Sequence, residues 1–136
     1  MATTKKEEKF IETIGRRKTA IARVRLTPSA RTLVTVNNED INVYFDTELL
    51  RMTALDPFLK VSLPVQFAVT VIVKGGGISG QAVAVRHAIS RALVLYQHTL
   101  RGVLKKEGFL KRDPRAKERR KFGFKKARKR AQWSKR

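Results

Sequence analysis

The glycine-rich stretch VIVKGGGISGQAVAV holds the residues whose spacing comes closest to a known chemistry. Gly75, Gly77 and Gly80 lie between a strand-like run and a helix-like run, in the G-x-G-x-x-G pattern of a dinucleotide-binding turn. Such a site also needs a second strand after the helix and an acidic residue about 20 positions further on, which holds a ribose hydroxyl. No strand-like run follows the helix, no Asp or Glu occurs between Asp56 and Glu107, and no Gly-Lys-Ser/Thr closes a P-loop. We therefore expect no nucleotide cofactor.

Two interpretations of these glycines stay open. The first is a tight strand-to-helix turn that needs positive φ, which glycine adopts without strain. The second is a phosphate site, in which bare backbone amides at a helix N-terminus approach a phosphate closely. In that case Lys74 would assist Gly75, Gly76 and Gly77, and the phosphate would belong to RNA rather than to a cofactor. Replacing Gly76 or Gly77 by Asp should then weaken RNA binding more than folding.

Side chains that usually carry catalysis or bind metals are sparse and poorly placed. The chain has no Cys, which excludes disulfides and thiolate metal sites. His87 and His98 are 11 positions apart, about 16 Å on a continuous helix, which is too far for one metal ion or one proton relay. No Ser has a nearby base with a third orienting group, and paired carboxylates are absent from the basic half. We expect no enzyme, cofactor or metal, and interpret each histidine as a surface or RNA-facing residue.

Charge is the strongest global signal. Lys and Arg total 31 against 11 Asp and Glu, a formal net charge of +20, which predicts a polyanionic partner, with nucleic acid as the first candidate. Residues 111–136 contain 14 basic and 2 acidic residues, whereas residues 1–110 contain 17 and 9. The tail has few aliphatic residues and should be extended or disordered until an anionic partner holds it. With no membrane-length apolar run and no signal or transit character, the chain is expected to be soluble and to work where it is made.

The body is predicted to be mixed α and β. Alternating or unbroken apolar runs predict strands at 9–15, 19–26, 31–38 and 66–74. Helical spacing predicts a short helix at 41–45, a helical or irregular segment at 47–61 interrupted by Pro57, and helices at about 79–97 and 99–107. The apolar stripe of the long helix is Ile78, Ala82, Val85, Ile89, Ala92, Leu93 and Tyr96. Two finer expectations are a turn at 27–29 and a last strand that is central and covered on both faces.

Two basic segments are candidates for binding RNA. Arg16, Arg17 and Lys18 lie between two predicted strands, where they would project from the sheet; a solvated hairpin is the alternative. The tail interleaves cations with Phe122, Phe124 and Trp133, so it offers phosphate ligands and flat rings for stacking on unpaired bases. The alternative there is a solvated polybasic run or a localisation signal.

Three segments carry a resemblance to a known family. GRRKTAIARVRL, VKGGGISGQAVAVRHAISRAL and RDPRAKERRKFGFKKARKRAQWSKR, in this order, closely resemble the bacterial and organellar ribosomal protein S nine family of the small subunit. The resemblance covers nearly the whole chain and is weakest over residues 1–9 and 39–65. The terminal Ser-Lys-Arg is of the bacterial type, since cytosolic eukaryotic relatives end in a Tyr-Arg pattern.

This resemblance implies a fold and a domain organisation. The fold would be α+β, a mixed sheet with helices on one side, like the second domain of ribosomal protein S five with its left-handed βαβ crossover, plus an extended basic C-terminal tail. Residues 1–9 would be a flexible N-terminus, 10–108 the RNA-binding body and 109–136 the tail. Some small-molecule kinases share this architecture, so the fold alone does not exclude an enzyme.

The resemblance also implies partners. The body would bind the 3′ major domain of the small-subunit rRNA, in the head, beside neighbouring head proteins. The tail would reach the peptidyl site, where Ser134, Lys135 and Arg136 would contact the anticodon stem-loop of the tRNA. The candidate rRNA ligands are Arg16, Arg17, Lys18, Arg23, Lys74, Gly75, Gly76, Gly77, Arg86, His87, Arg112, Arg115, Arg119, Arg120, Lys121, Lys125, Lys126, Arg128, Lys129 and Arg130.

Two positions in the tail depart from the family pattern. Ala131 stands where Pro is usual, which frees φ before the tip, and Trp133 stands where Phe is usual. The ribosome would be that of a bacterium, a plastid or a mitochondrion. The alternatives to a structural ribosomal protein are a free nucleic-acid-packaging protein and a nucleotide-dependent enzyme that uses residues 75–80.

Overall fold

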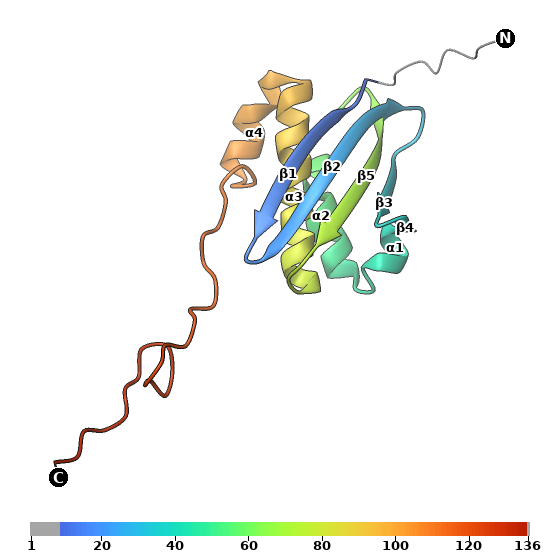
Figure 1. The fold of residues 1–136 in the computed structure, drawn as a ribbon. Helices are drawn as coiled ribbons and strands as arrows, with labels where there is room; N and C mark the ends of the chain where they lie inside the picture. Colours follow the sequence, from blue (N-terminus) through green and yellow to red (C-terminus); the bar gives the residue numbers. More distant parts are fainter. Residues whose placement is uncertain (1–8, 136) are drawn as a thin grey trace.

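The alternating segments of the chain form one mixed sheet in a computed structural model that describes residues 9–135 (Figure 1). The strands are β1 (Ile11–Arg17), β2 (Ala20–Ser29), β3 (Leu33–Val36), β4 (Glu39–Asp40) and β5 (Gln66–Lys74), in the spatial order β1-β2-β5-β3-β4. All neighbouring pairs are antiparallel except β3 and β5, which are parallel. The helices are α1 (Ile41–Tyr44), α2 (Glu48–Lys60), α3 (Ile78–Tyr96), the 3-10 turn η1 (His98–Leu100) and α4 (Arg101–Lys106). The α+β class and the mixed sheet are confirmed.

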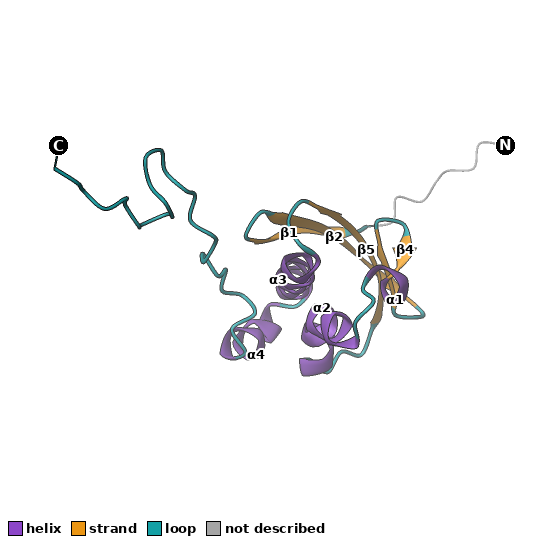
Figure 2. Cartoon of the chain, turned by 90° about the horizontal axis from the view of Figure 1, so that it is seen from below, coloured by secondary structure: helices purple, strands orange, loops and turns teal. Residues whose placement is uncertain are grey.

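The helices lie on one face of the sheet and leave the other face open (Figure 2). The core forms where the inward side chains of β2 and β5 meet α3, because strand side chains alternate between faces. β5 is central, as expected, but the expectation that it is covered on both faces is wrong. Its outward residues Thr70 and Lys74 are exposed, since none of the helices in residues 9–135 lies above that face.

The buried face of α3 differs from the predicted stripe. Ile78 and Tyr96, at the two ends of the helix, are exposed. Small residues that the stripe omitted are buried instead: Ala84, Ala88 and Ser90. Ala84 and Ala88 are buried because the edge strand β1 also packs on α3, beside the stripe that faces β2 and β5.

The contact between β1 and α3 is unusually close. A Cβ atom on Gly15 would overlap the carbonyl oxygen of Ala84 and lie 2.5 Å from the backbone nitrogen of Ala88. The buried Thr13 donates a hydrogen bond from Oγ1 to the carbonyl of Ala88 at 2.8 Å. Backbone therefore packs against backbone here, which only glycine and alanine permit.

Two prolines do not break their elements where the sequence predicted. The expected turn at 27–29 is wrong, since β2 continues through Pro28 to Ser29 beside β5. β1 pairs with β2 only as far as Leu26, so Pro28 lies where β2 has one neighbour and a missing N–H is tolerated. Pro57 lies inside the continuous helix α2 with its ring buried, so packing offsets the lost helical hydrogen bond.

The end of β3 is set by two residues with positive φ. Asn37 and Asn38 have φ of 49° and 67° and connect β3 to β4, the conformation typical of a two-residue hairpin turn. The Asn37 side chain then extends the ladder. Its amide donates to the Val73 carbonyl at 3.2 Å and accepts from the Val73 N–H at 2.9 Å.

The chain leaves the body after α4 (Figure 1). Phe109 is buried in the core and Leu110 packs against it, so apolar packing against the body continues to residue 110. From Lys111 to Lys135 the described chain has no helix and one isolated bridge, between Phe124 and Arg130. No helix among residues 9–135 is long and apolar enough to cross a membrane.

The contact at Gly15 gives a test of the fold. We expect Gly15→Ala to lower the free energy of unfolding by about 3 kcal/mol, because the new methyl group must force β1 away from α3. Gly102→Ala in α4, where a Cβ meets no atom within 4 Å, should be neutral or stabilise by up to about 1 kcal/mol. Urea unfolding of both variants measures the difference; equal midpoints would contradict the close packing.

Candidate nucleic-acid interface

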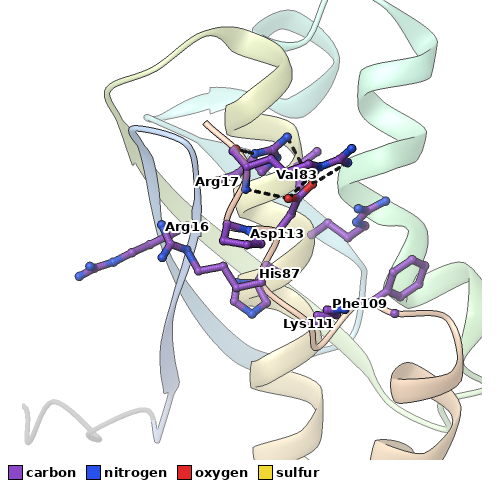
Figure 3. Close-up of a pocket in the computed structure, with 12 residues that line it drawn as sticks. Arg16, Arg17, Val83, His87, Phe109, Lys111 and Asp113 are labelled. Carbon is purple, nitrogen blue, oxygen red and sulfur yellow. Dashed lines mark hydrogen bonds and ion pairs between the residues drawn. The ribbon is translucent and has the colours of Figure 1, made fainter. Parts of the chain in front are cut away.

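A cationic cleft of about 640 Å³ lies where the start of the tail passes the end of β1 and the side of α3 (Figure 3). Three parts of the chain that are distant in sequence form its walls. Its polar lining consists of Arg16, Arg17, Arg86, His87, Lys111, Arg112, Asp113 and Arg115. Six of these are permanent cations and one is a carboxylate, so the cleft suits a strongly anionic ligand.

Asp113 ties the tail to the body. Its carboxylate lies 3.4 Å from Arg17 Nη2 and accepts hydrogen bonds from the backbone N–H of Arg115 at 2.9 Å and from the Arg115 guanidinium at 2.9 and 3.1 Å. Arg17 also donates to the Arg115 carbonyl. The hydrogen bonds from the Arg115 side chain and backbone hold the pKa of the Asp113 carboxyl well below its usual range. The anchor therefore stays charged at any physiological pH.

The remaining cations of the cleft differ in whether they already have an ion-pair partner. Arg86 lies 3.6 Å from the Asp56 carboxylate and stacks over the Phe109 ring at 5.0 Å. Arg16, Lys111 and Arg112 are exposed, and within residues 9–135 no carboxylate lies within ion-pair distance of them. These three side chains can meet a phosphate without first breaking an ion pair.

His87 is half-buried on the α3 wall of the cleft. Burial, and then the charge of Arg91, lower the pKa of its imidazole, with further contributions from Arg112 and Arg86. Its Nδ1 atom is buried without a hydrogen-bond partner in the part of the chain that the structure describes. The ring is therefore neutral at neutral pH and leaves one polar atom unsatisfied.

In the glycine loop, Gly75 and Gly76 serve the strand-to-helix turn. Gly75 and Gly76 have φ of 73° and 68°, and Cβ atoms on them would lie 2.9 Å from the Thr19 carbonyl oxygen and from Ala20. We therefore expect Gly76→Asp to destabilise the fold as well, because that residue has positive φ and is packed against Ala20 at the start of β2. Positive φ and close packing explain these two glycines without a ligand.

Gly77 is different from its two neighbours. It has φ −87° and ψ 161°, is the N-cap of α3, and a Cβ there would meet no atom within 4 Å. Gly77 has no side chain that could cap this helix terminus, and the carbonyl of Gly75 accepts a hydrogen bond from Gln81 Nε2 at 3.1 Å. The first N–H groups of α3 are thus presented at an open N-terminus.

The structure divides the predicted site residues into three groups and leaves Arg23 apart from them. Six of them meet in the cleft: Arg16, Arg17, Arg86, His87, Arg112 and Arg115. A second group lies at the end of the sheet where β2 begins and β5 ends: Lys18, Lys74, Gly75, Gly76 and Gly77. Arg23 stands on the open face of the sheet, paired in register with Ile14 and Ile72.

The third group lies in the tail and makes contacts within it. Glu118 accepts hydrogen bonds from Arg128 at 2.8 Å and from Lys121 at 3.2 Å, which lower the pKa of its carboxyl. Arg130 stacks over the Phe124 ring at 5.1 Å. The other predicted cations here are exposed: Arg119, Arg120, Lys125, Lys126 and Lys129. Arg136 lies outside the described residues, as do residues 1–8 of the expected flexible N-terminus.

The prediction from sequence missed Lys111, Arg91 and Asp113. Lys111 lines the cleft, and Arg91 reaches the Ile14 carbonyl at 2.5 Å and so joins α3 to β1. The sequence did contain a signal for Asp113. It is one of only two carboxylates in the tail, among 14 cations, and Pro114 follows it. An isolated acid in a basic tail points to a structural ion pair, but its partner on β1 is visible only in three dimensions.

A small α+β body with a cationic cleft and a cationic tail is an architecture suited to a polyanionic partner. A sequence model of the family described as ribosomal protein S9/S16 matches residues 15–136, which include the cleft, the glycine loop and the tail. The chain therefore belongs to the ribosomal protein S9/S16 family, as the resemblance of its motifs indicated. It is a structural protein of the small ribosomal subunit, and its place is the ribosome.

Gly77 separates folding from binding. We expect Gly77→Asp to leave the melting temperature unchanged or slightly raised, because Asp is a good N-cap, yet to weaken binding to a head-domain rRNA fragment by placing a carboxylate where the phosphate would approach. Gly77→Asn is the matched control, because it caps equally well without the charge. If both variants bind RNA as the unmodified chain does, this helix terminus does not face a phosphate.

Proposed function

We propose that this chain binds the 3′ major domain of the small-subunit rRNA through the cleft and the tail, and contacts peptidyl-site tRNA through its C-terminus. The observation that carries the proposal is the cleft, in which six cations from β1, α3 and the tail meet around a single carboxylate. Concentrating like charge in this way costs free energy in the absence of an anion, so the arrangement suits a bound phosphate. In a protein of the small ribosomal subunit the abundant polyanion is rRNA.

The chemistry of the free cations supports RNA phosphates as ligands. Arg16 and Arg112 carry guanidinium groups that bind phosphate through two parallel hydrogen bonds, and Lys111 adds a mobile ammonium. The release of counterions from RNA phosphates makes such contacts favourable at low salt. His87 also lines the cleft, with its Nδ1 atom buried.

The tail continues the same surface with aromatic residues. Phe122 is fully exposed and Trp133 is 79% exposed, so both rings are free to stack on unpaired bases. Phe124 is already stacked with Arg130. We place the boundary between body and tail near residue 110, with rRNA held on both sides of it.

The tip of the tail is the part proposed to meet tRNA. Ser134 is exposed, and Lys135 beside it keeps its cation in solvent. Arg136 lies outside the described residues, so its role rests on its charge and on the family resemblance of the Ser-Lys-Arg ending. The host ribosome would be that of a bacterium, a plastid or a mitochondrion.

Arg112→Ala tests the cleft. A charge-assisted phosphate contact contributes roughly 1.5–3 kcal/mol to binding. Because the other contacts remain, we expect a loss near the lower value, which corresponds to about tenfold weaker rRNA affinity. The slope of log affinity against log salt should become shallower by about 0.7 to 0.9. Arg31→Ala is the matched control, because it removes an exposed guanidinium from the loop between β2 and β3. Equal effects of the two variants would contradict a specific role of the cleft.

Deletion of residues 134–136 tests the tRNA contact. The deletion removes two side-chain cations and no core residue, so folding and subunit assembly should survive. We expect the off-rate of peptidyl-site tRNA from purified small subunits to rise by at most about tenfold. This is the smallest effect expected for the loss of one charge-assisted contact, because the tRNA keeps its other contacts. Arg136→Lys should be milder, because it keeps the charge and loses only the planar fork. Equal off-rates for the full-length and the truncated protein across a range of salt would exclude the tRNA contact. That result would not contradict the proposed binding to rRNA.

A further inference from the structure

The outward face of α2 is apolar, which is unusual for a helix at the surface of a protein. Leu49, Met52 and Leu59 are 69%, 50% and 68% exposed. Their spacing of three and seven positions places them on one side of the helix, together with Asp56, whose carboxylate lies 3.6 Å from Arg86 of α3. The inward face is apolar as well, with Ala54 and Pro57 buried against the core. α2 therefore exposes three large apolar side chains on the side that the described chain leaves uncovered.

The same region carries an acidic rim in a chain of net charge +20. Residues 39–50 contain four carboxylates and no cation: Glu39, Asp40, Asp46 and Glu48. In residues 9–135 no basic side chain lies within ion-pair distance of any of them. The nearest cation in sequence, Arg51, is turned back to the carbonyls of Phe45 and Asp46 at 2.8 and 2.7 Å.

The acidic rim lies on the side of the body away from the tail. In Figures 1 and 2 the tail leaves on one side, while α1 and β4, which border the loop into α2, lie on the other. Val43 of α1, on this second side, is 65% exposed. The body thus has a cationic side and an acidic, apolar side, which cannot both suit the same ligand.

We propose that the outward face of α2, with Val43 and the acidic rim, docks a basic protein segment of the small subunit. RNA is excluded as the occupant by four unpaired carboxylates, which repel phosphate. A second copy is disfavoured because the contact would bring two acidic rims together. A basic segment with one or two apolar anchors satisfies both features, since its cations meet the rim and its anchors cover the stripe. This proposal goes beyond rRNA binding and does not depend on the cleft.

Photocrosslinking in assembled subunits tests the proposal. Met52 is replaced by p-benzoylphenylalanine in the full chain, and small subunits are reconstituted with it and irradiated. The expected product is a crosslink to a different protein, at a Lys- or Arg-rich segment identified by mass spectrometry. Leu33, which is 56% exposed on the open face of the sheet, carries the same probe as the matched control and should not give that product.

Charge reversal supplies the second measurement. Glu48→Lys should lower the yield of the Met52 crosslink several-fold, because it turns attraction into repulsion at the rim. Ser62→Lys, which adds a cation beyond the other end of α2, should leave the yield unchanged. A crosslink to rRNA, to a second copy or to an acidic segment would overturn the proposal, and so would a yield no higher than that of the Leu33 control.

Discussion

The closeness of β1 to α3 determines how the rest of the molecule is arranged. Gly15 lets the strand lie directly on the helix backbone, and Thr13 fixes it there with a hydrogen bond to Ala88. With β1 in that position, Arg17 at its end reaches the tail at Asp113. A strand held further from the helix would separate these walls, and the cationic cleft would not form.

The cleft in turn places the tail. Asp113 is bound by Arg17 on one side and by Arg115 on the other, so the first residues of the tail are fixed at the body before the chain extends away. An extended basic chain loses conformational entropy when it is ordered, and each residue fixed in advance lowers that cost on binding. The acidic side of the body is subject to a second constraint, because its carboxylates repel RNA phosphates. A protein assembled within RNA must turn surfaces that repel phosphate toward something else.

Most of the fold could be predicted from the sequence, because period-two and helical spacing are local signals. The predicted strands at 9–15, 19–26 and 66–74 and the long helix correspond to β1, β2, β5 and α3. The errors came from tertiary context. Pro28 continues a strand because β1 has already ended beside it, and Ala84 and Ala88 are buried because β1 packs beside the predicted stripe. The exposed apolar side chains of α2 were not predicted, because the residue types of Leu49 and Met52 do not show whether these side chains are buried or exposed.

The candidate site was predictable by residue type but not by grouping. Arg16, Arg17, Arg112 and Arg115 were named from charge runs, yet nothing local places residues nearly 100 positions apart around one carboxylate. Likewise, three adjacent glycines look equivalent in the sequence. The contacts of Gly75 and Gly76 with Thr19 and Ala20 separate them from Gly77, which alone could be altered without strain.

The proposed role of the cleft beside β1 is to hold rRNA phosphates. Cryo-electron microscopy of small subunits that contain this chain, with tRNA in the peptidyl site, measures this directly. We expect rRNA phosphate oxygens within hydrogen-bonding distance of Arg112 and of at least one of Arg16 and Lys111, with Asp113 still bound to Arg17. A cleft that faces solvent or another protein in a well-resolved map would contradict this role.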